Sequence, residues 1–287
     1  MRSRSITFLL ALPGIAWLVA FLVVPCGIIL AYAFMTRGVY GGVVSDFTLE
    51  NVQRIADGLY LGIFLTSARV AAVAAIVSLI IGYPAAYAIS RAPQAWQLPL
   101  LFLIILPFWS NYLIRTYAWI VLLNRSGLVN ALISAVTGNL SEINFLYNEG
   151  AIVIGLVYNY LPFVILSVFA SIQRLNPEVL EASEDLGASP WRTFFKVMLP
   201  LTMPGIVAGG VFVFVLSIGN FVTPVLLGGG QVTMVGNIIY EQYMAARDWP
   251  FGSALALGLI TIMLGLLLLQ GMLANRLRRI ETEAQDG

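Results

Sequence analysis

Residue types that usually carry catalytic chemistry are scarce in this chain. It has no histidine, so histidine triads, histidine general bases and histidine metal sites are excluded. Its single cysteine, Cys26, lies inside an apolar run and cannot form an internal disulfide or a two-cysteine site. Its single lysine, Lys196, follows a phenylalanine, whereas a phosphate-binding loop needs Gly-Lys-Ser/Thr. The chain therefore lacks that ATP site and most of the usual catalytic groups, although an enzyme remains an alternative.

Charge is gathered at one place in the sequence. Four of the 14 acidic residues lie within eight positions: Glu178, Glu181, Glu184 and Asp185. Asn176 followed by Pro177 is typical of a helix start, and acidic side chains near a helix N-terminus are favoured by the helix dipole. Gly187 suits the left-handed conformation that ends a helix. Residues 176–187 are therefore predicted to form a short, acidic helix that ends at a glycine.

A second short helix is predicted directly after it. Ser189 and Pro190 repeat the start pattern, and bulky apolar residues then recur at helical spacing: Trp191, Phe194, Phe195 and Met198. The first helix has a smaller apolar face of Val179, Ala182, Ser183 and Leu186. Two interpretations fit this helix–glycine–helix: a solvated helix at a membrane surface, or a docking element for a soluble partner with charge at its rim.

The remaining sequence predicts helices that cross a lipid bilayer. The chain has 287 residues, of which 60% are hydrophobic and only 10% charged, with a mean hydropathy of +0.90. Soluble domains carry about 25% charged residues. Six apolar runs are about as long as a crossing of the hydrocarbon core requires: 8–34, 63–90, 98–123, 151–173, 203–227 and 252–275. With a net charge of +1 and no basic face, nucleic acid is not expected as a partner.

The distribution of arginine and lysine predicts that both termini lie in the cytoplasm. Such residues are enriched in cytoplasmic loops. With the N-terminus inside, nine of them fall in inner segments, namely Arg2, Arg4, Arg91, Arg174, Arg192, Lys196, Arg276, Arg278 and Arg279, and four in outer ones, namely Arg37, Arg54, Arg125 and Arg247. The first run is much longer than the core of a secretory signal, so we interpret it as a retained membrane helix.

Polar residues beside prolines are the candidates for a solute pathway. Pro84, Pro107, Pro162 and Pro224 interrupt the apolar runs, and each leaves a backbone carbonyl without its usual donor. Such groups must be satisfied by neighbouring helices or by a wet cavity. The candidates for the pathway are Trp109, Asn111, Tyr112, Tyr158, Asn159, Asn220 and Thr223.

Two arginines fall inside predicted spans. Arg69 and Arg115 are expected to be buried charges that face the bundle interior or water. They could contact an anionic substrate or form a gate. We favour a structural role in which they bond carbonyls freed by nearby prolines. The spans hold no matching carboxylate, which counts against a proton-driven carrier.

The acidic loop resembles a motif of ABC importer permeases. Glu181-Ala182-Ser183, then Gly187, then Leu199-Pro200 is similar to the EAA motif, with serine in place of the second alanine. The resemblance implies that Glu181, Ala182, Ser183, Asp185 and Gly187 belong to coupling helices, at about 176–199, that dock on an ATPase. It also implies the type I importer permease fold over residues 62–272, after a first helix and external loop (1–61) and before a cytoplasmic tail (273–287).

Three further stretches resemble the permeases of spermidine/putrescine-type importers. They are LPFWSNYLIRTYAW from Leu106, SIGNFVTPVLLGG from Ser217 and RDWPFGSA from Arg247. Relatives often carry acidic residues where this chain has Asn220 and near Val225. Their absence favours a substrate less positively charged than a doubly cationic polyamine, or a charge supplied by the partner permease.

The sequence thus predicts an all-α, six-span permease subunit with both termini inside. It is expected in the bacterial cytoplasmic membrane, carrying a polyamine or a related amine or amino-acid-like compound inward. The resemblance implies as partners two ATPase subunits that bind ATP and Mg²⁺, a second related permease and an external substrate-binding protein. No cofactor or metal is expected in this chain. The alternatives are a secondary transporter or channel without an ATPase, and a membrane-embedded enzyme.

Overall fold

The structure is a computed structural model that describes residues 12–137 and 144–285. Arg2 and Arg4 of the orientation analysis lie outside this range. Within it, the chain forms two compact units: the segment up to Ile63 together with Ile238–Ile262, and Phe64–Asn237 together with the segment from Met263. Residues 238–262 thus pack with the N-terminal segment, and the permease core of 62–272 stays a prediction.

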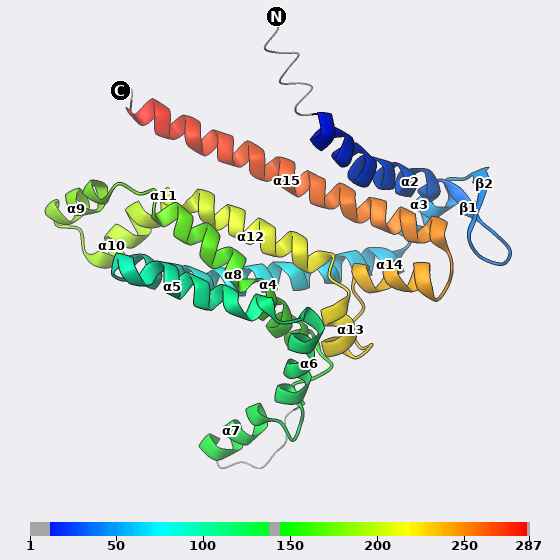
Figure 1. Ribbon diagram of the computed structural model, residues 1–287, viewed down its shortest axis with the longest axis horizontal. Coiled ribbons are helices and arrows are strands. Elements are labelled where there is room, and N and C mark those ends of the chain that lie inside the picture. Colours follow the sequence, from blue (N-terminus) through cyan, green and yellow to red (C-terminus); the bar gives the residue numbers. More distant parts are fainter. Residues whose placement is uncertain (1–11, 138–143, 286–287) are drawn as a thin grey trace, which may run out of the picture. The chain divides into compact units, whose positions relative to one another are not determined.

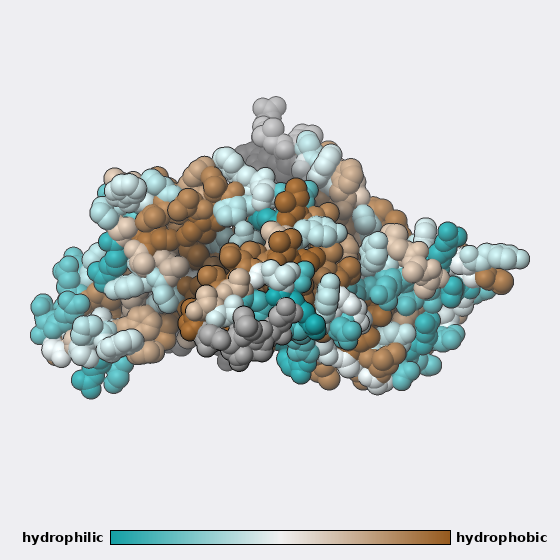
Figure 2. Space-filling model, turned by 90° about the horizontal axis from the view of Figure 1, so that it is seen from below, coloured by the Kyte–Doolittle hydropathy of each residue, from teal (hydrophilic) through white to brown (hydrophobic). Residues whose placement is uncertain are grey.

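The described residues contain five helices long and apolar enough to cross a membrane. They are Leu12–Ala33, Gly58–Arg91, Tyr112–Val136, Glu149–Ile172 and Trp249–Met272. A bent pair, Pro190–Leu201 with Met203–Ile218 at 66°, raises the count to six if it is one span. Large hydrophobic side chains remain exposed along these helices, as in a protein solvated by lipid. Figure 2 shows such hydrophobic side chains exposed on one face of the molecule.

The first unit joins the N-terminal helix to a small antiparallel sheet. A π-helical turn η1 (Val19–Val23) leads into α2 (Val24–Ala33), followed by β1 (Met35–Arg37), β2 (Val43–Phe47) and α3 (Glu50–Ile55). The hairpin is an addition to the predicted all-α architecture, which is otherwise confirmed. The rest of this unit comes from α14 (Val235–Met244) and the start of α15 (Trp249–Gln285), which is helical through the predicted tail to Gln285.

An ion pair fastens the two parts of the first unit. Arg54 and Asp248 are 3.1 Å apart, the Arg54 guanidinium lies 3.7 Å from the ring centroid of Phe251, and Asp248 also accepts a hydrogen bond from the Phe251 backbone N–H. Asn51 donates to the carbonyls of Ala33 and Met35. These bonds tie the loop between the first two spans to the start of the last one.

The second unit is a bundle built around α8 (Glu149–Ile172), α12 (Met203–Ile218) and α4 (Gly58–Arg91). Figure 1 shows α8 and α12 side by side, with α9 (Pro177–Asp185) at one end of this unit and α13 (Val222–Gly228) at the other. The close approach depends on small residues. A Cβ added at Gly209 would lie 3.2 Å from the Cα of Val164, and one at Gly205 would lie 2.7 Å from the carbonyl oxygen of Ser167.

Two predicted spans are broken. The run predicted at 98–123 consists of α5 (Gln94–Ile105), the 3-10 turn η2 (Leu106–Trp109) and α6 (Tyr112–Leu123), with α7 (Leu128–Thr137) after it. The run predicted at 203–227 is α12 up to Ile218, then a non-helical turn, then α13. In contrast, Pro84 and Pro162 lie inside the continuous helices α4 and α8. Proline therefore interrupts the helix in only two of the four expected places.

Candidate functional site

A polar cluster lies where α12 and α13 are separated. Asn220 stands in the turn between them, outside any helix. Its side-chain amide nitrogen donates to the hydroxyls of Tyr112 (2.6 Å) and Tyr160 (2.7 Å). Its amide oxygen accepts from the backbone N–H of Thr223 at 2.9 Å, and the hydroxyls of Thr223 and Tyr112 are 2.6 Å apart. Three chain segments thus meet at Asn220.

The surrounding sequence explains why the break persists. Gly236 has no Cβ, and a Cβ there would lie 2.8 Å from the carbonyl oxygen of Asn220, so only glycine allows α14 to begin this close to the turn. The Asn237 side chain donates to the carbonyl of Phe221 at 3.5 Å, and Ser67 accepts from the Val235 N–H at 2.8 Å. Two backbone groups close to the break, the Phe221 carbonyl and the Val235 N–H, are thereby hydrogen-bonded within the protein, as a hydrocarbon environment requires.

The structure brings three of the seven predicted pathway residues together and adds one that the sequence analysis missed. Tyr112, Asn220 and Thr223 form the polar cluster, and Tyr160 completes it. Tyr158 and Asn159 are the residues predicted to line the pathway in the run before Pro162. The polar side chain that follows them, Tyr160, is the one that reaches Asn220, and the spacing offered no means of choosing among the three.

The other four predicted residues lie elsewhere. Asn111 caps α6 by accepting from the Leu113 N–H, and exposed Trp109 packs edge-on against Phe102. Tyr158 packs edge-on against Trp119. Asn159 is 1% exposed and donates to the Gly155 carbonyl, while its amide oxygen is buried with no hydrogen-bond partner in the described part of the chain. Asn111 therefore has a structural role, and Asn159 is an unsatisfied polar group inside α8.

The acidic helix ends as the sequence predicts. The Asn176 side chain caps α9 through the Glu178 N–H at 3.1 Å, with Pro177 in the first turn. Gly187 has φ +79° and ends it. Ser189 occupies the cap position of the next helix without making a side-chain cap, which corrects that detail. The second helix consists of α10 (Pro190–Thr193), a π turn η3 (Phe194–Met198) and α11 (Leu199–Leu201).

The helix pair presents one face to the bundle and the other outward. Leu180, Phe194 and Met198 pack on the core formed with α4, α8 and α12. The Ser183 and Thr193 hydroxyls, 3.0 Å apart, join the two helices. The outward face holds Leu186, which is 89% exposed, and Trp191, which is 74% exposed and stacks on Phe195. The predicted four-residue apolar face of the second helix is therefore divided, because the bundle covers only Phe194 and Met198.

The carboxylates and small residues around this outward apolar face are exposed. Glu181, Ala182 and Asp185 face outward on α9, and neither acidic residue has an ion-pair partner within the described residues. A Cβ added at Gly187 would meet nothing within 4 Å, so its positive φ, rather than crowding inside this chain, requires glycine. Exposed apolar side chains rimmed by charge mark a protein interaction site. We name this surface the α9–α10 face.

Arg69 and Arg115 have different surroundings. Arg69 is not buried in this chain: its side chain is 63% exposed and pairs with Glu149 rather than with carbonyls freed by proline. Glu149 is the first residue of α8 and was missed because the predicted span began at 151. The Arg115 guanidinium lies 4.6 Å from the Phe108 ring centroid, and two of its nitrogens are buried with no hydrogen-bond partner among the described residues.

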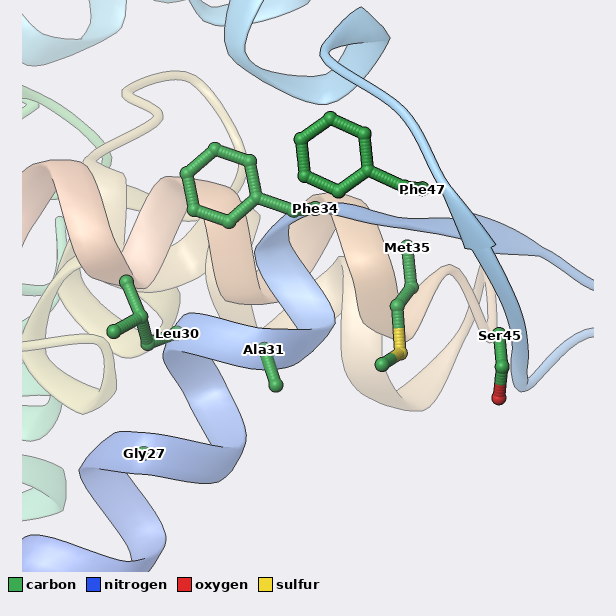
Figure 3. Close-up of a pocket in the computed structure, with 7 residues that line it drawn as sticks. All are labelled: Gly27, Leu30, Ala31, Phe34, Met35, Ser45 and Phe47. Atoms are coloured by element: carbon green, nitrogen blue, oxygen red, sulfur yellow. The ribbon is translucent and has the colours of Figure 1, made fainter.

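A separate groove in the first unit has little capacity for a polar solute. It lies between α2 and the hairpin and is lined by Gly27, Leu30, Ala31, Phe34, Met35, Ser45 and Phe47. Figure 3 shows the Phe34 and Phe47 rings beside each other, and their centroids are 5.9 Å apart. Ser45 carries the only polar side chain among these lining residues. The groove therefore offers no group that would hold a charged or strongly polar molecule.

Comparisons with known proteins identify similar chains. The family model described as "Binding-protein-dependent transport system inner membrane component" matches residues 3–279. The chain is 40% identical over 270 residues to the spermidine/putrescine transport system permease protein PotB of Haemophilus influenzae, covering 93% of this chain and 94% of that protein. It is 39% identical over 271 residues to PotB of Escherichia coli, covering 94% and 98%.

A solved structure shares the fold. It is a bacterial alginate ABC transporter in complex with an alginate pentasaccharide-bound periplasmic protein, and the matched chain superposes with a TM-score of 0.73. The superposition covers 96% of each chain at 18% identity. At that identity the likeness concerns the fold alone.

Proposed function

The chain belongs to the family of binding-protein-dependent transport system inner membrane components, and from that premise we propose that it carries polyamines inward. It is a permease subunit of an ABC importer, a multi-pass inner membrane protein with the type I fold, and ATP is hydrolysed by a separate ATPase. The observation that carries the polyamine proposal is the full-length similarity, at about 40% identity, to permeases named for spermidine and putrescine.

The polar cluster supports a route for hydrogen-bonding solutes. Asn220, Tyr112, Tyr160 and Thr223 offer uncharged oxygens beside a broken helix, where transporters build solute sites. Hydroxyl and amide oxygens accept hydrogen bonds from ammonium groups without the strong binding that a carboxylate would add. A cation can therefore pass such a cluster without being retained there.

The geometry also supports a path for coupling. The α9–α10 face is joined to α12 through the bent pair Pro190–Leu201 and Met203–Ile218. At its other end α12 leads directly into the turn that holds Asn220. An ATPase docked on the α9–α10 face would move one end of α12, and the 16-residue helix, about 24 Å long at 1.5 Å per residue, would carry that motion to the polar cluster.

The proposed assembly has four kinds of component. Membership of the family implies an ATPase and a substrate-binding protein as partners. We propose two ATPase copies, each holding ATP and Mg²⁺, a second related permease, and an external binding protein that delivers the substrate. The similarity to PotB favours a second permease that differs from this one. A secondary transporter or a membrane enzyme finds no support in these features.

A second substrate class is favoured by one observation. The Arg115 guanidinium is partly buried, carries no ion pair among the described residues and lies near Tyr112, one turn along α6. A cationic group there would disfavour a purely cationic cargo and favour an amine that also bears an anionic group. Asn220, neutral where relatives often have an acid, agrees with that alternative. Arg115→Gln would distinguish the two classes, because it should weaken uptake of only a zwitterionic cargo.

Transport by the complete assembly tests the proposal. The chain is reconstituted in liposomes with its ATPase, second permease and binding protein, and uptake of radiolabelled putrescine and spermidine is measured with ATP enclosed in the lumen on the ATPase side. We expect uptake that requires both ATP and the binding protein. Uptake without the ATPase would instead identify a secondary transporter. No uptake of either amine by an assembly that hydrolyses ATP would overturn the polyamine proposal.

A further inference from the structure

An ion pair lies on an exposed surface near the end of the second unit that is predicted to be external. Arg69 of α4 donates to the carboxylate of Glu149, and the two side chains are 63% and 43% exposed. The pair has no part in the core: the buried residues are Val70, which follows Arg69, and Ala151, two residues after Glu149. Both charges therefore face outward from the chain.

This surface cannot face lipid. Arg69 lies inside α4, six residues within the apolar run that begins at 63, which corresponds to about 9 Å along the helix. Charged side chains at such depth face water or another protein, because exposing them to hydrocarbon is costly. Since the pair already neutralises its own charge, a second permease would not be needed to satisfy it. A water-filled entrance at this surface would account for the exposure of both groups.

Helix α8 links this entrance to the polar cluster. Glu149 and Tyr160 are eleven residues apart, which is about three turns, so they lie on nearly the same face and about 16 Å apart along the axis. The segment before Glu149 also reaches the broken helix, because the Tyr147 N–H donates to the Leu227 carbonyl of α13 at 2.8 Å. Glu149 therefore lies on the side of the polar cluster that is predicted to be external.

We propose that Glu149 is the entry site for the cargo's ammonium group, and that Arg69 occupies the carboxylate between arrivals. This inference rests on the proposed function, since it requires an amine as cargo. An arriving ammonium replaces the guanidinium at Glu149, so one cation is exchanged for another and the carboxylate is never left unpaired. The competition with Arg69 keeps the site weak enough to release the amine toward Tyr160 and Asn220.

Two single substitutions separate this role from a structural one. Glu149→Gln removes the negative charge and keeps only one amide oxygen as an acceptor, and we expect the KM for putrescine uptake to rise about tenfold or more, the loss typical of a hydrogen bond to a charged group. Arg69→Gln frees the carboxylate, and we expect the KM to stay the same or fall. If the salt bridge only holds α4 against α8, both substitutions should impair putrescine uptake. Asp46→Asn, which removes an exposed carboxylate on β2, is the matched control and should leave the KM unchanged.

A charge swap covers the case in which a single variant fails to assemble. The Arg69→Glu/Glu149→Arg double variant restores the pair but moves the carboxylate to α4. All variants are reconstituted with the ATPase and the binding protein, and copurified ATPase is quantified beside putrescine uptake. We expect the double variant to assemble and to transport poorly. Normal uptake by the double variant, or equal losses in both single variants, would overturn this inference while wild-type uptake still supports the proposed function. Absence of amine uptake by the wild type would overturn both.

Discussion

The side-chain amide of Asn220 donates to the hydroxyl of Tyr160 at 2.7 Å, and this bond joins the turn after α12 to the middle of α8. The two residues are 60 positions apart in sequence. Tyr160 lies two residues before Pro162 inside the continuous helix α8, whereas Asn220 lies in the break between α12 and α13. The bond therefore fixes the geometry of the proposed route.

Substitutions at Asn220 should change transport more than assembly. Asn220→Leu leaves the hydroxyl of Tyr160 without its donor and the Thr223 N–H without its acceptor, which costs about 1–3 kcal/mol per unsatisfied buried group. We expect uptake to fall at least tenfold while ATPase copurification is retained. Asn220→Asp places a negative charge in the cluster and should therefore shift substrate preference toward more highly charged cations. Both tyrosine hydroxyls can turn to donate to the new carboxylate.

The measurement for Asn220 is uptake of putrescine and spermidine beside a pull-down of the ATPase. Thr261→Val is a suitable control, since within the described part of the chain the Thr261 hydroxyl bonds only to the Leu257 carbonyl of its own helix. Unchanged uptake in Asn220→Leu would show that the polar cluster does not line the route.

Gly187 should be needed for its backbone conformation. At φ +79° a β-branched residue is strained by about 1–2 kcal/mol, so Gly187→Val is expected to turn α10 away from α9 and to uncouple ATP hydrolysis from uptake. Asparagine tolerates this conformation, and Gly187→Asn should therefore preserve coupling. Binding-protein-stimulated ATPase activity and uptake are measured together. Failure of both variants alike would indicate that the docked partner, rather than φ, excludes a side chain at this position.

The outward apolar side chains of the α9–α10 face should bind the ATPase. Leu186→Asp places a charge on an exposed leucine of this face, and we expect loss of ATPase copurification with the protein still in the membrane. Val39→Asp changes an equally exposed apolar residue, 95% exposed, on the predicted external hairpin loop, and should leave copurification unchanged. If Leu186→Asp retains the ATPase at the wild-type level, the partner docks elsewhere.

Asp248 should stabilise the first unit. Asp248→Ala removes the partner of Arg54 and the acceptor of the Phe251 N–H together, and we expect a loss of about 2 kcal/mol, since Arg54 is partly solvated. Asp248→Asn keeps an acceptor for the N–H and should cost less. Thermal unfolding in detergent, compared with the exposed Asp46→Asn, measures both. Equal melting temperatures for Asp248→Ala and the wild type would refute a stabilising role.

The orientation in the membrane remains a prediction from arginine and lysine. Tags at both termini should report the cytoplasm, and a reporter near Asp46 should report the outside. An external terminus would place the α9–α10 face away from any ATPase.

Composition and local spacing determined much of this protein. Long apolar runs predict membrane helices because lipid tolerates few charges, and the structure places helices in each of them. The Asn176 cap and the positive φ of Gly187 were also predictable, because both depend on residues adjacent in sequence. The resemblance of the acidic loop to a permease motif agrees with the family match.

Contacts between distant segments were decided by the tertiary structure alone. Apolar runs do not reveal where a helix breaks: the α12–α13 break depends on Gly236 and Asn237 approaching from a later segment. Tyr160 was indistinguishable from Tyr158 by spacing, since only the packing of α8 against α12 and α13 decides which hydroxyl meets Asn220. Glu149 became visible as the partner of Arg69 only when α4 and α8 were placed together. Hydropathy records how much of a segment avoids water, whereas a site depends on which side chains meet across helices.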